Sequence, residues 1–198
     1  MGIGMKRNLT VIVTAAALLA SFGSASADQE FNPLQQLFGL GSSSYSGSGA
    51  GPIPRTTVNF EGNYAPGTII VDTIERRLYL VQDGGRALRY GIGVGRDGFR
   101  WGGTHRITAK KEWPEWTPPS QMLARRPDLP RHMKGGPDNP LGARAMYLGS
   151  TLYRIHGSNE PETIGQAVSS GCFRMVNDDV IDLYSRVPVG TTVIVKNN

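Results

Sequence analysis

From residue 64 onward, short apolar and β-branched runs alternate with turn-forming residues. The first run, residues 67–73, is mostly β-branched and apolar, which predicts a largely buried strand. Residues 77–82 have the same strand-like composition, and an Asp-Gly-Gly turn at residues 83–85 follows them. This order predicts a hairpin whose returning strand covers residues 86–94.

The same pattern continues to the end of the chain. Further short strands are predicted at residues 104–111, 145–149, 152–156 and 190–196. Short helices are predicted at residues 120–125, with Ser120 as the cap, at residues 161–168, and after a capping Asn177. Residues 131–142 form a long irregular loop between these elements. We therefore expect a mainly β, sandwich-like domain with a few short helices.

The N-terminus has the order of regions that is typical of a secretory signal peptide. Lys6 and Arg7 precede an apolar run at residues 9–20, and Ser-Ala-Ser-Ala follows at residues 24–27. The apolar run is shorter than the ~20 residues that a membrane-spanning helix requires. The prediction is a signal peptide at residues 1–27, removed after Ala27 during export to the periplasm or cell envelope.

Residues 28–63 are predicted to be a flexible segment rather than part of the domain. Residues 39–51 consist almost entirely of glycine, serine and alanine, a linker composition that does not build a core. The predicted catalytic domain therefore covers residues 64–198.

The charge of the chain gives no sign of nucleic-acid binding. Without Lys6 and Arg7, the 21 basic residues fall to 19 against 16 acidic residues, a net charge of +3 with no basic stripe. The glycine-spaced run at residues 91–95 is not a dinucleotide fingerprint, because no helix is predicted directly after it. We expect no nucleic-acid partner and no nucleotide cofactor.

The chain holds one cysteine, Cys172, and three histidines, one of which is His156. A single cysteine forms no internal disulfide, so in an oxidising compartment it is reactive, buried or intermolecular. The glycine and serines that precede Cys172 favour a reactive thiol. A thiol with a pKa of ~8.5 needs a base or a positive neighbour to act as a nucleophile. His156 is the candidate base, since a sixteen-residue connection can fold back to the cysteine.

Three more features complete the candidate catalytic site. The backbone carbonyl of Gly157 is expected to hold the imidazole ring, and the N–H groups of Gly171 and Cys172 are expected to bind an oxyanion. One cysteine and three scattered histidines do not supply the four closely spaced ligands of a structural zinc site. No metal is expected.

Candidate substrate-binding residues lie on both sides of this motif. Arg174 lies two positions after the cysteine, where it either lowers the thiol pKa, receives a substrate carboxylate, or forms a surface ion pair. Trp113 and Trp116 either form one wall of a substrate groove or cover the edge of the sheet.

These motifs resemble one known family. The pairs His156-Gly157 and Ile164-Gly165, followed by Ser-Ser-Gly-Cys-Phe-Arg-Met at residues 169–175, resemble the signature of the L,D-transpeptidases with a YkuD-type catalytic domain. Asn-Pro-Leu-Gly at residues 139–142 and Ala-Met-Tyr-Leu at residues 145–148 also match. The resemblance covers roughly residues 66 to 196.

The resemblance implies a YkuD-like β-sandwich and a specific reaction. Cys172 would attack the carbonyl that joins a diamino acid to D-Ala in a peptidoglycan tetrapeptide stem, and His156 would transfer the protons. The resulting thioester would pass to an amine of another stem or of an envelope protein, and carbapenems would acylate the same cysteine. The expected substrate-binding residues are Ser170, Arg174, Tyr147 and Trp116. The resemblance implies neither a metal nor an organic cofactor.

The chain departs from the family pattern at two places. Many members have histidine at the position of Ser170, and residues 100–103 replace a common Thr-Pro-x-Gly segment. Two alternatives remain: a wall-peptide hydrolase that uses water as the acceptor, and a binding module that has lost catalysis. The intact Cys172 and His156 argue against the second.

Overall fold

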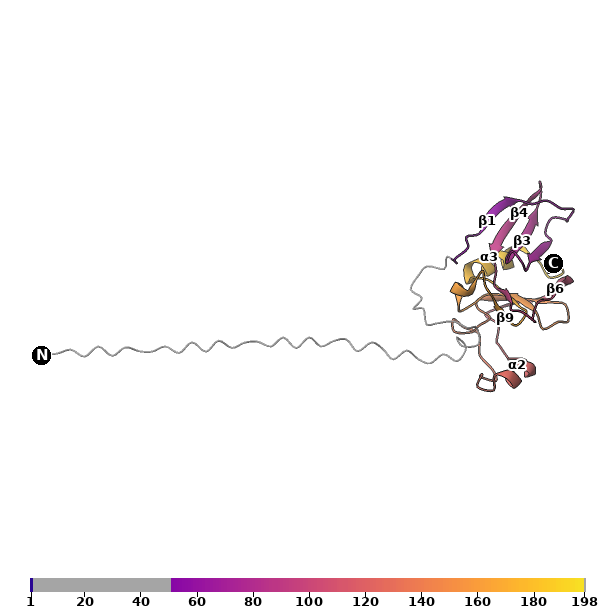
Figure 1. Ribbon diagram of the computed structural model, residues 1–198. Helices are drawn as coiled ribbons and strands as arrows, with labels where there is room; N and C mark the ends of the chain where they lie inside the picture. The colour runs from indigo at the N-terminus through magenta and orange to yellow at the C-terminus, as the bar shows by residue number, and fades with distance from the viewer. Residues whose placement is uncertain (2–50, 198) are drawn as a thin grey trace. The chain divides into compact units, whose positions relative to one another are not determined.

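The structure of the chain is a computed structural model that describes residue 1 and residues 51–197 (Figure 1). Residues 2–27 of the predicted signal peptide and residues 28–50 of the predicted flexible segment lie outside the described residues. In the part that is described, no helix is both long enough and apolar enough to cross a bilayer.

Most of the strands belong to one nine-stranded sheet in the order β1-β4-β3-β2-β11-β6-β7-β8-β10. Its strands are β1 (Thr56–Asn59), β2 (Ile69–Asp72), β3 (Arg77–Gln82), β4 (Arg86–Gly91), β6 (Gly103–Glu112), β7 (Arg144–Leu148), β8 (Arg154–His156), β10 (Phe173–Arg174) and β11 (Thr192–Lys196). A second, two-stranded sheet pairs β5 (Val94–Gly95) with β9 (Ala167–Ser169) in parallel.

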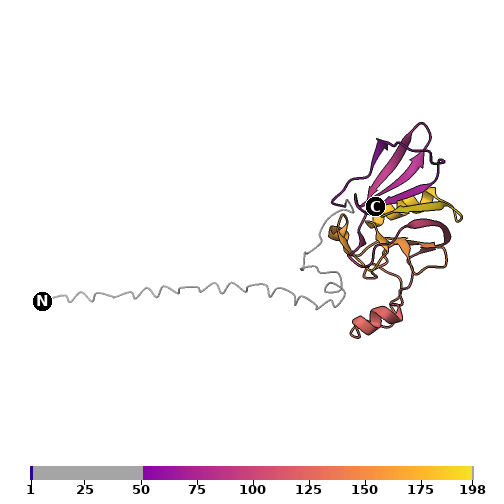
Figure 2. The same cartoon turned by 45° about the vertical axis from the view of Figure 1, so that its right-hand side comes forward.

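The long strand β6 joins the two halves of the large sheet. Its first residues pair with β11, and after an irregularity between Ile107 and Ala109 the rest of the strand pairs with β7. Figures 1 and 2 show the β1-β4-β3 half apart from the half that contains β6, with α3 (Asn177–Arg186) lying between them. One hydrophobic core includes side chains from both halves and from α3, such as Leu78, Ile155 and Leu183. The predicted mainly β, sandwich-like fold is confirmed.

The strand β1 was not predicted. Residues 56–59 belong to the segment that we expected to be flexible, yet they pair in antiparallel register with β4. Three of the four residues, Thr56, Thr57 and Val58, are β-branched, which favours a strand even where few side chains are apolar. The predicted domain boundary at residue 64 is therefore too late.

The predicted helix at residues 161–168 is mostly wrong. Only Pro161–Thr163 form a single 3-10 turn, and Ala167–Ser169 instead form β9. Gly165 has φ of +92°, a conformation that ends the helix and that residues with a side chain rarely adopt. The change matters for the site, because β9 leads directly to Cys172.

Both predicted helix caps are also wrong. The cap positions are Pro119 for α2 (Ser120–Arg125) and Val176 for α3, and neither helix has a side-chain cap. The Oδ1 atom of Asn177 instead accepts a hydrogen bond from the Ala143 N–H at 2.9 Å. Asn177 therefore ties the start of α3 to the loop before β7.

Candidate active site

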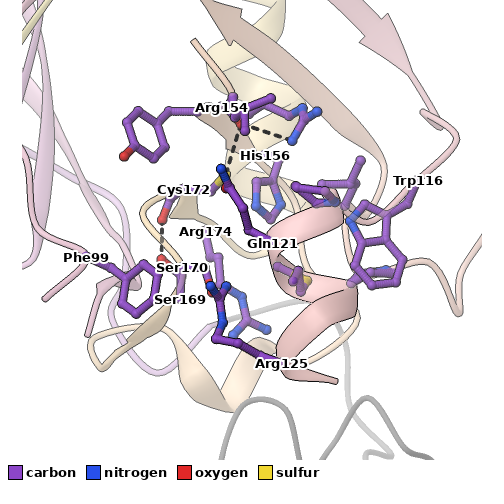
Figure 3. Close-up of a pocket in the computed structure, with 16 residues that line it drawn as sticks. Phe99, Trp116, Gln121, Arg125, Arg154, His156, Ser169, Ser170, Cys172 and Arg174 are labelled. Atoms are coloured by element: carbon purple, nitrogen blue, oxygen red, sulfur yellow. Dashed lines mark hydrogen bonds between the residues drawn. The ribbon is translucent and has the colours of Figure 1, made fainter. Parts of the chain in front are cut away.

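A cavity of about 280 Å³ lies beside the β8 and β10 strands (Figure 3). Cys172 and His156 both line it, as the sequence predicted, together with Ser169 and Ser170. The residues on α2 and Trp116 line it from another part of the chain. Sixteen side chains line the cavity, and none of them is acidic.

His156 ends β8 and is held between two neighbouring strands. It pairs with Ala145 on β7 and with Arg174 on β10, and it exposes only 5% of its surface. Its Nδ1 lies 2.6 Å from the Gly157 carbonyl oxygen. This is the carbonyl that the sequence indicated as the group that holds the imidazole ring. A carbonyl only accepts hydrogen bonds, so Nδ1 carries the proton and Nε2 is left as the basic nitrogen.

The electrostatic surroundings keep this imidazole neutral. Burial lowers the pKa of His156 to about 3, and the positive charges of Arg174 and Arg154 act in the same direction. The Gly157 carbonyl opposes them by favouring the protonated ring. At neutral pH the ring is therefore in the form that accepts a proton.

Cys172 lies on the turn between β9 and β10 and is partly exposed. Burial raises the pKa of its thiol, while the nearby guanidinium groups of Arg154 and Arg174 lower it. The Sγ atom lies 3.9 Å from the Leu152 carbonyl oxygen. Within residues 51–197, no hydrogen bond joins this thiol to His156. The two groups share a cavity but are not yet engaged, as is common for catalytic pairs before substrate binds.

Hydrogen bonds from the Ser169 side chain stabilise the turn that carries the cysteine. Its Oγ donates to the Cys172 carbonyl at 2.7 Å and accepts from the Gly171 N–H at 3.1 Å. This corrects the prediction that the Gly171 N–H binds an oxyanion, because that donor is already used. None of the described residues accepts a hydrogen bond from the N–H of Cys172, which stays available to a ligand.

The backbone conformation at position 171 requires glycine. Its φ is +107°, and a Cβ atom at this position would lie 2.5 Å from the Tyr153 ring. Trp101 also holds this glycine. Its Nε1–H donates to the Gly171 carbonyl at 2.7 Å, and its ring stacks on Tyr153 with centroids 4.4 Å apart. The sequence did not single out Trp101, which lies in the segment that departs from the family pattern.

Arg174 is buried and already paired. Its side chain exposes 1% of its surface, and its Nη2 donates to Glu160 Oε2 at 2.6 Å and to Ser158 Oγ at 2.9 Å. The pair is buried and is therefore not the predicted surface ion pair, while Arg174 also lines the cavity. Its charge acts instead on the neighbouring His156 and Cys172, whose pKa values it lowers.

Arg154 is a residue of the cavity that sequence reasoning missed. Its Nη1 donates to the Leu152 carbonyl at 3.1 Å, and its guanidinium lies 5.1 Å from the centroid of the Tyr147 ring. Tyr147 itself does not line the cavity, so the structure does not support the predicted contact between this tyrosine and substrate. The available signal was strand alternation, since Arg154 precedes His156 by two residues and shares its side of β8.

The two tryptophans have different places. Trp116 exposes 5% of its surface and belongs to a small hydrophobic cluster with Leu129 and Leu141. It also forms part of the cavity wall. Trp113 is 44% exposed and does not line the cavity.

Ser170 lines the cavity as expected, and its Oγ accepts a hydrogen bond from Arg96 Nη1 at 3.4 Å. In residues 51–197 no three His, Cys, Asp or Glu side chains form a cluster that could hold a metal ion.

Comparison with known proteins places this site in a family. Residues 66–195 match the YkuD L,D-transpeptidase catalytic domain. "Probable L,D-transpeptidase YbiS" of Escherichia coli (strain K12) is 41% identical over 134 residues, which are 63% of this chain and 43% of that protein. "Probable L,D-transpeptidase ErfK/SrfK" of Salmonella typhimurium is 39% identical over 133 residues, 63% of this chain and 42% of that protein. The chain thus spans less than half the length of these curated relatives.

Solved structures show the same fold. L,D-transpeptidase 3 from Mycobacterium tuberculosis, in complex with a faropenem-derived adduct, has a TM-score of 0.54 and 16% identity, and the match covers 66% of this chain and 60% of that one. A Brucella melitensis structure described as a probable carnitine operon oxidoreductase has a TM-score of 0.50 and 49% identity, and it covers 71% of this chain and 91% of that one.

Proposed function

The chain belongs to the YkuD family of L,D-transpeptidase catalytic domains, and we propose that it is a peptidoglycan L,D-transpeptidase with Cys172 as its nucleophile. The oxidoreductase description of the Brucella melitensis structure is not carried over to this chain. The glycine-spaced residues 91–95 lead through β5 into a loop and then β6, whereas a dinucleotide site needs a helix there.

The first half of the proposed reaction forms a thioester. His156 Nε2 takes the proton of the Cys172 thiol as Sγ bonds to the carbonyl carbon between the diamino acid and D-Ala of a tetrapeptide stem. The tetrahedral intermediate collapses when the carbon–nitrogen bond breaks, and His156 returns the proton to the amine of the departing D-Ala. The acyl group remains on sulfur.

The second half transfers the acyl group to an amine. An amine of a second stem, or of an envelope protein, attacks the thioester while His156 accepts its proton. The carbon–sulfur bond then breaks, and His156 returns this proton to the departing Cys172 sulfur. The products are a 3→3 cross-link or an anchored protein. Attack by water in place of the amine would give a tripeptide, which is the hydrolase alternative.

The observation that carries this proposal is the state of the imidazole beside the thiol. His156 is buried, is held through Nδ1 by Gly157, and stays neutral, so it has a free basic nitrogen at the cavity that Cys172 also lines. Burial raises the thiol pKa, so Cys172 is protonated at rest and depends on that base. A general base of this kind contributes about 10²–10⁴-fold to the rate.

Backbone and neighbouring side chains complete the proposed site. The N–H of Cys172 supplies a donor for the oxyanion, and the positive φ of Gly171 sets its direction. Ser170 and Trp116 contact the bound peptide from opposite parts of the cavity lining. We propose that carbapenems acylate Cys172, in keeping with the faropenem-derived adduct and the imipenem complex of two structural neighbours. Export through residues 1–27 would bring the site to its substrate in the cell envelope.

Analysis of muropeptides tests the proposal. The full chain is incubated with a disaccharide-tetrapeptide, and the products are separated and identified by mass spectrometry, with Cys172→Ala as the control. Dimers joined 3→3 support transfer between stems, whereas tripeptide alone supports hydrolysis. Neither product from the unaltered chain, or equal product from the control, contradicts the proposal.

A further inference from the structure

Two arginines gather on one aromatic ring at the edge of the cavity. The guanidinium carbon of Arg96 lies 4.4 Å from the centroid of the Phe99 ring, and that of Arg125 lies 5.2 Å from it. Phe99 and Arg125 line the cavity together with Ser170 (Figure 3). We call these three residues, Arg96, Phe99 and Arg125, the arginine cluster.

The cluster is built onto the catalytic turn. Arg96 follows β5 directly, and its N–H donates to the Ser169 carbonyl at 3.0 Å. Its Nη1 donates to Ser170 Oγ at 3.4 Å, and the Phe99 N–H donates to the Arg96 carbonyl at 2.9 Å. Arg125 comes from the last turn of α2. Arg96 is therefore hydrogen-bonded to Ser169 and Ser170, the residues three and two positions before the proposed nucleophile.

The two positive charges of the cluster have no counter-charge in the described chain. In residues 51–197, no carboxylate lies within 4.0 Å of either guanidinium, whereas the adjacent Arg100 pairs with Asp97 at 3.0 Å. The charge of Arg125, together with burial, lowers the pKa of Arg96. Arg96 is half-buried and Arg125 is exposed. Bringing their two like charges together is unfavourable, and a bound anion would relieve it.

Carboxylate is the anion that fits both the donors and the reaction. Guanidinium groups bind carboxylates through paired, charge-assisted hydrogen bonds. In the reaction proposed above, the leaving D-Ala is the last residue of the donor stem and carries a free carboxylate. That carboxylate is separated from the attacked carbonyl carbon by one nitrogen and one Cα, about 4 Å along the bonds. Cys172 and Ser170, the hydroxyl partner of Arg96, line the same cavity.

We propose that Arg96 and Arg125 form a subsite that binds the C-terminal carboxylate of the donor peptide. This inference rests on the proposed function, because it takes the leaving residue from that reaction. The subsite positions the donor so that its last peptide bond lies over Cys172. It also discriminates against donors whose C-terminal carboxylate is blocked.

Calorimetric titration of the full chain carrying Cys172→Ala tests the subsite without turnover. The probes are a synthetic tetrapeptide with a diamino acid at position three and D-Ala at position four, and the same peptide with a C-terminal amide. We expect the acid to bind about ten- to a hundredfold more tightly than the amide, the range for charge-assisted hydrogen bonds. Combining Arg96→Gln with Arg125→Gln should remove this preference.

Matched variants separate charge recognition from structure. Arg100→Gln removes a neighbouring arginine that is already paired, and it should leave the acid-to-amide ratio unchanged. Arg96→Lys keeps the charge, and it should retain part of the preference. The inference is overturned if the Arg96→Gln, Arg125→Gln variant still prefers the acid, if the Cys172→Ala chain shows no preference, or if both peptides weaken equally.

The same peptides distinguish this inference from the proposed function. Incubated with the chain that keeps Cys172, the acid donor reports acylation of the cysteine by release of free D-Ala. Release of D-Ala with no acid preference in binding overturns the subsite and leaves the proposed acylation of Cys172 standing. An acid preference that depends on Arg96 and Arg125, without any D-Ala release, supports the subsite and overturns the transpeptidase.

Discussion

Replacing Glu160 with glutamine removes the counter-charge of Arg174 and preserves the shape of the side chain. The two side chains expose 5% and 1% of their surfaces and are joined at 2.6 Å. Removing one partner of a buried ion pair costs about 3–5 kcal/mol, because the remaining charge stays in a poorly solvated site. For a domain of this size each kcal/mol corresponds to about 2–4 °C in Tm, so we expect a loss of about 6–20 °C.

The assay is thermal and urea unfolding of the full chain, followed by circular dichroism. Glu162→Gln is the matched control, since it removes an exposed carboxylate two residues away and should change Tm by no more than about 2 °C, as is usual for surface substitutions. A loss below about 1 kcal/mol for Glu160→Gln would contradict this expectation. It would mean that the Arg174 guanidinium is hydrated.

Three further substitutions test how the catalytic turn is held. Arg154→Met should raise the pKa of the Cys172 thiol further, so the rise of carbapenem acylation with pH should move to higher pH; an unmoved profile would contradict the role of this charge. Trp101→Phe removes the donor to the Gly171 carbonyl, so it should cost about 0.5–1.5 kcal/mol of stability and slow acylation. Acylation at the original rate would contradict a role of Trp101 in positioning the turn. Gly171→Ala should cost about 1–3 kcal/mol from its positive φ alone, with further loss from contact with Tyr153, and urea unfolding at the original midpoint would contradict this.

The strands of the core were predictable because their side chains report their burial. β2 and β3 coincide with the β-branched and apolar runs at residues 67–73 and 77–82, and glycine marks the turn after β3. β1 could not be found in this way, since it is a polar edge strand whose partner, β4, lies about thirty residues away in the chain. Pairing across such a distance leaves no trace in local composition.

The proposed catalytic pair was predictable for a different reason. Cys172 and His156 belong to a motif whose residue types have few other uses together, and the structure places both on one cavity. The hydrogen-bond partners were not predictable, because they come from folded geometry. Glu160 lies fourteen residues before Arg174, and nothing in the sequence says that this carboxylate, rather than solvent or substrate, meets the guanidinium. Likewise, the Oγ atom of Ser169 accepts a hydrogen bond from the Gly171 N–H only because the turn brings the serine side chain back toward it.

In the proposed reaction Cys172 carries the acyl group of a peptidoglycan stem. Intact-mass spectrometry of the chain, mixed with a tetrapeptide donor in the absence of an acceptor amine, tests it most directly. We expect a mass increase equal to the donor minus D-Ala, located on Cys172 by peptide mapping and absent from Cys172→Ala. An equal adduct on the alanine variant, or release of D-Ala by that variant at the original rate, would contradict it.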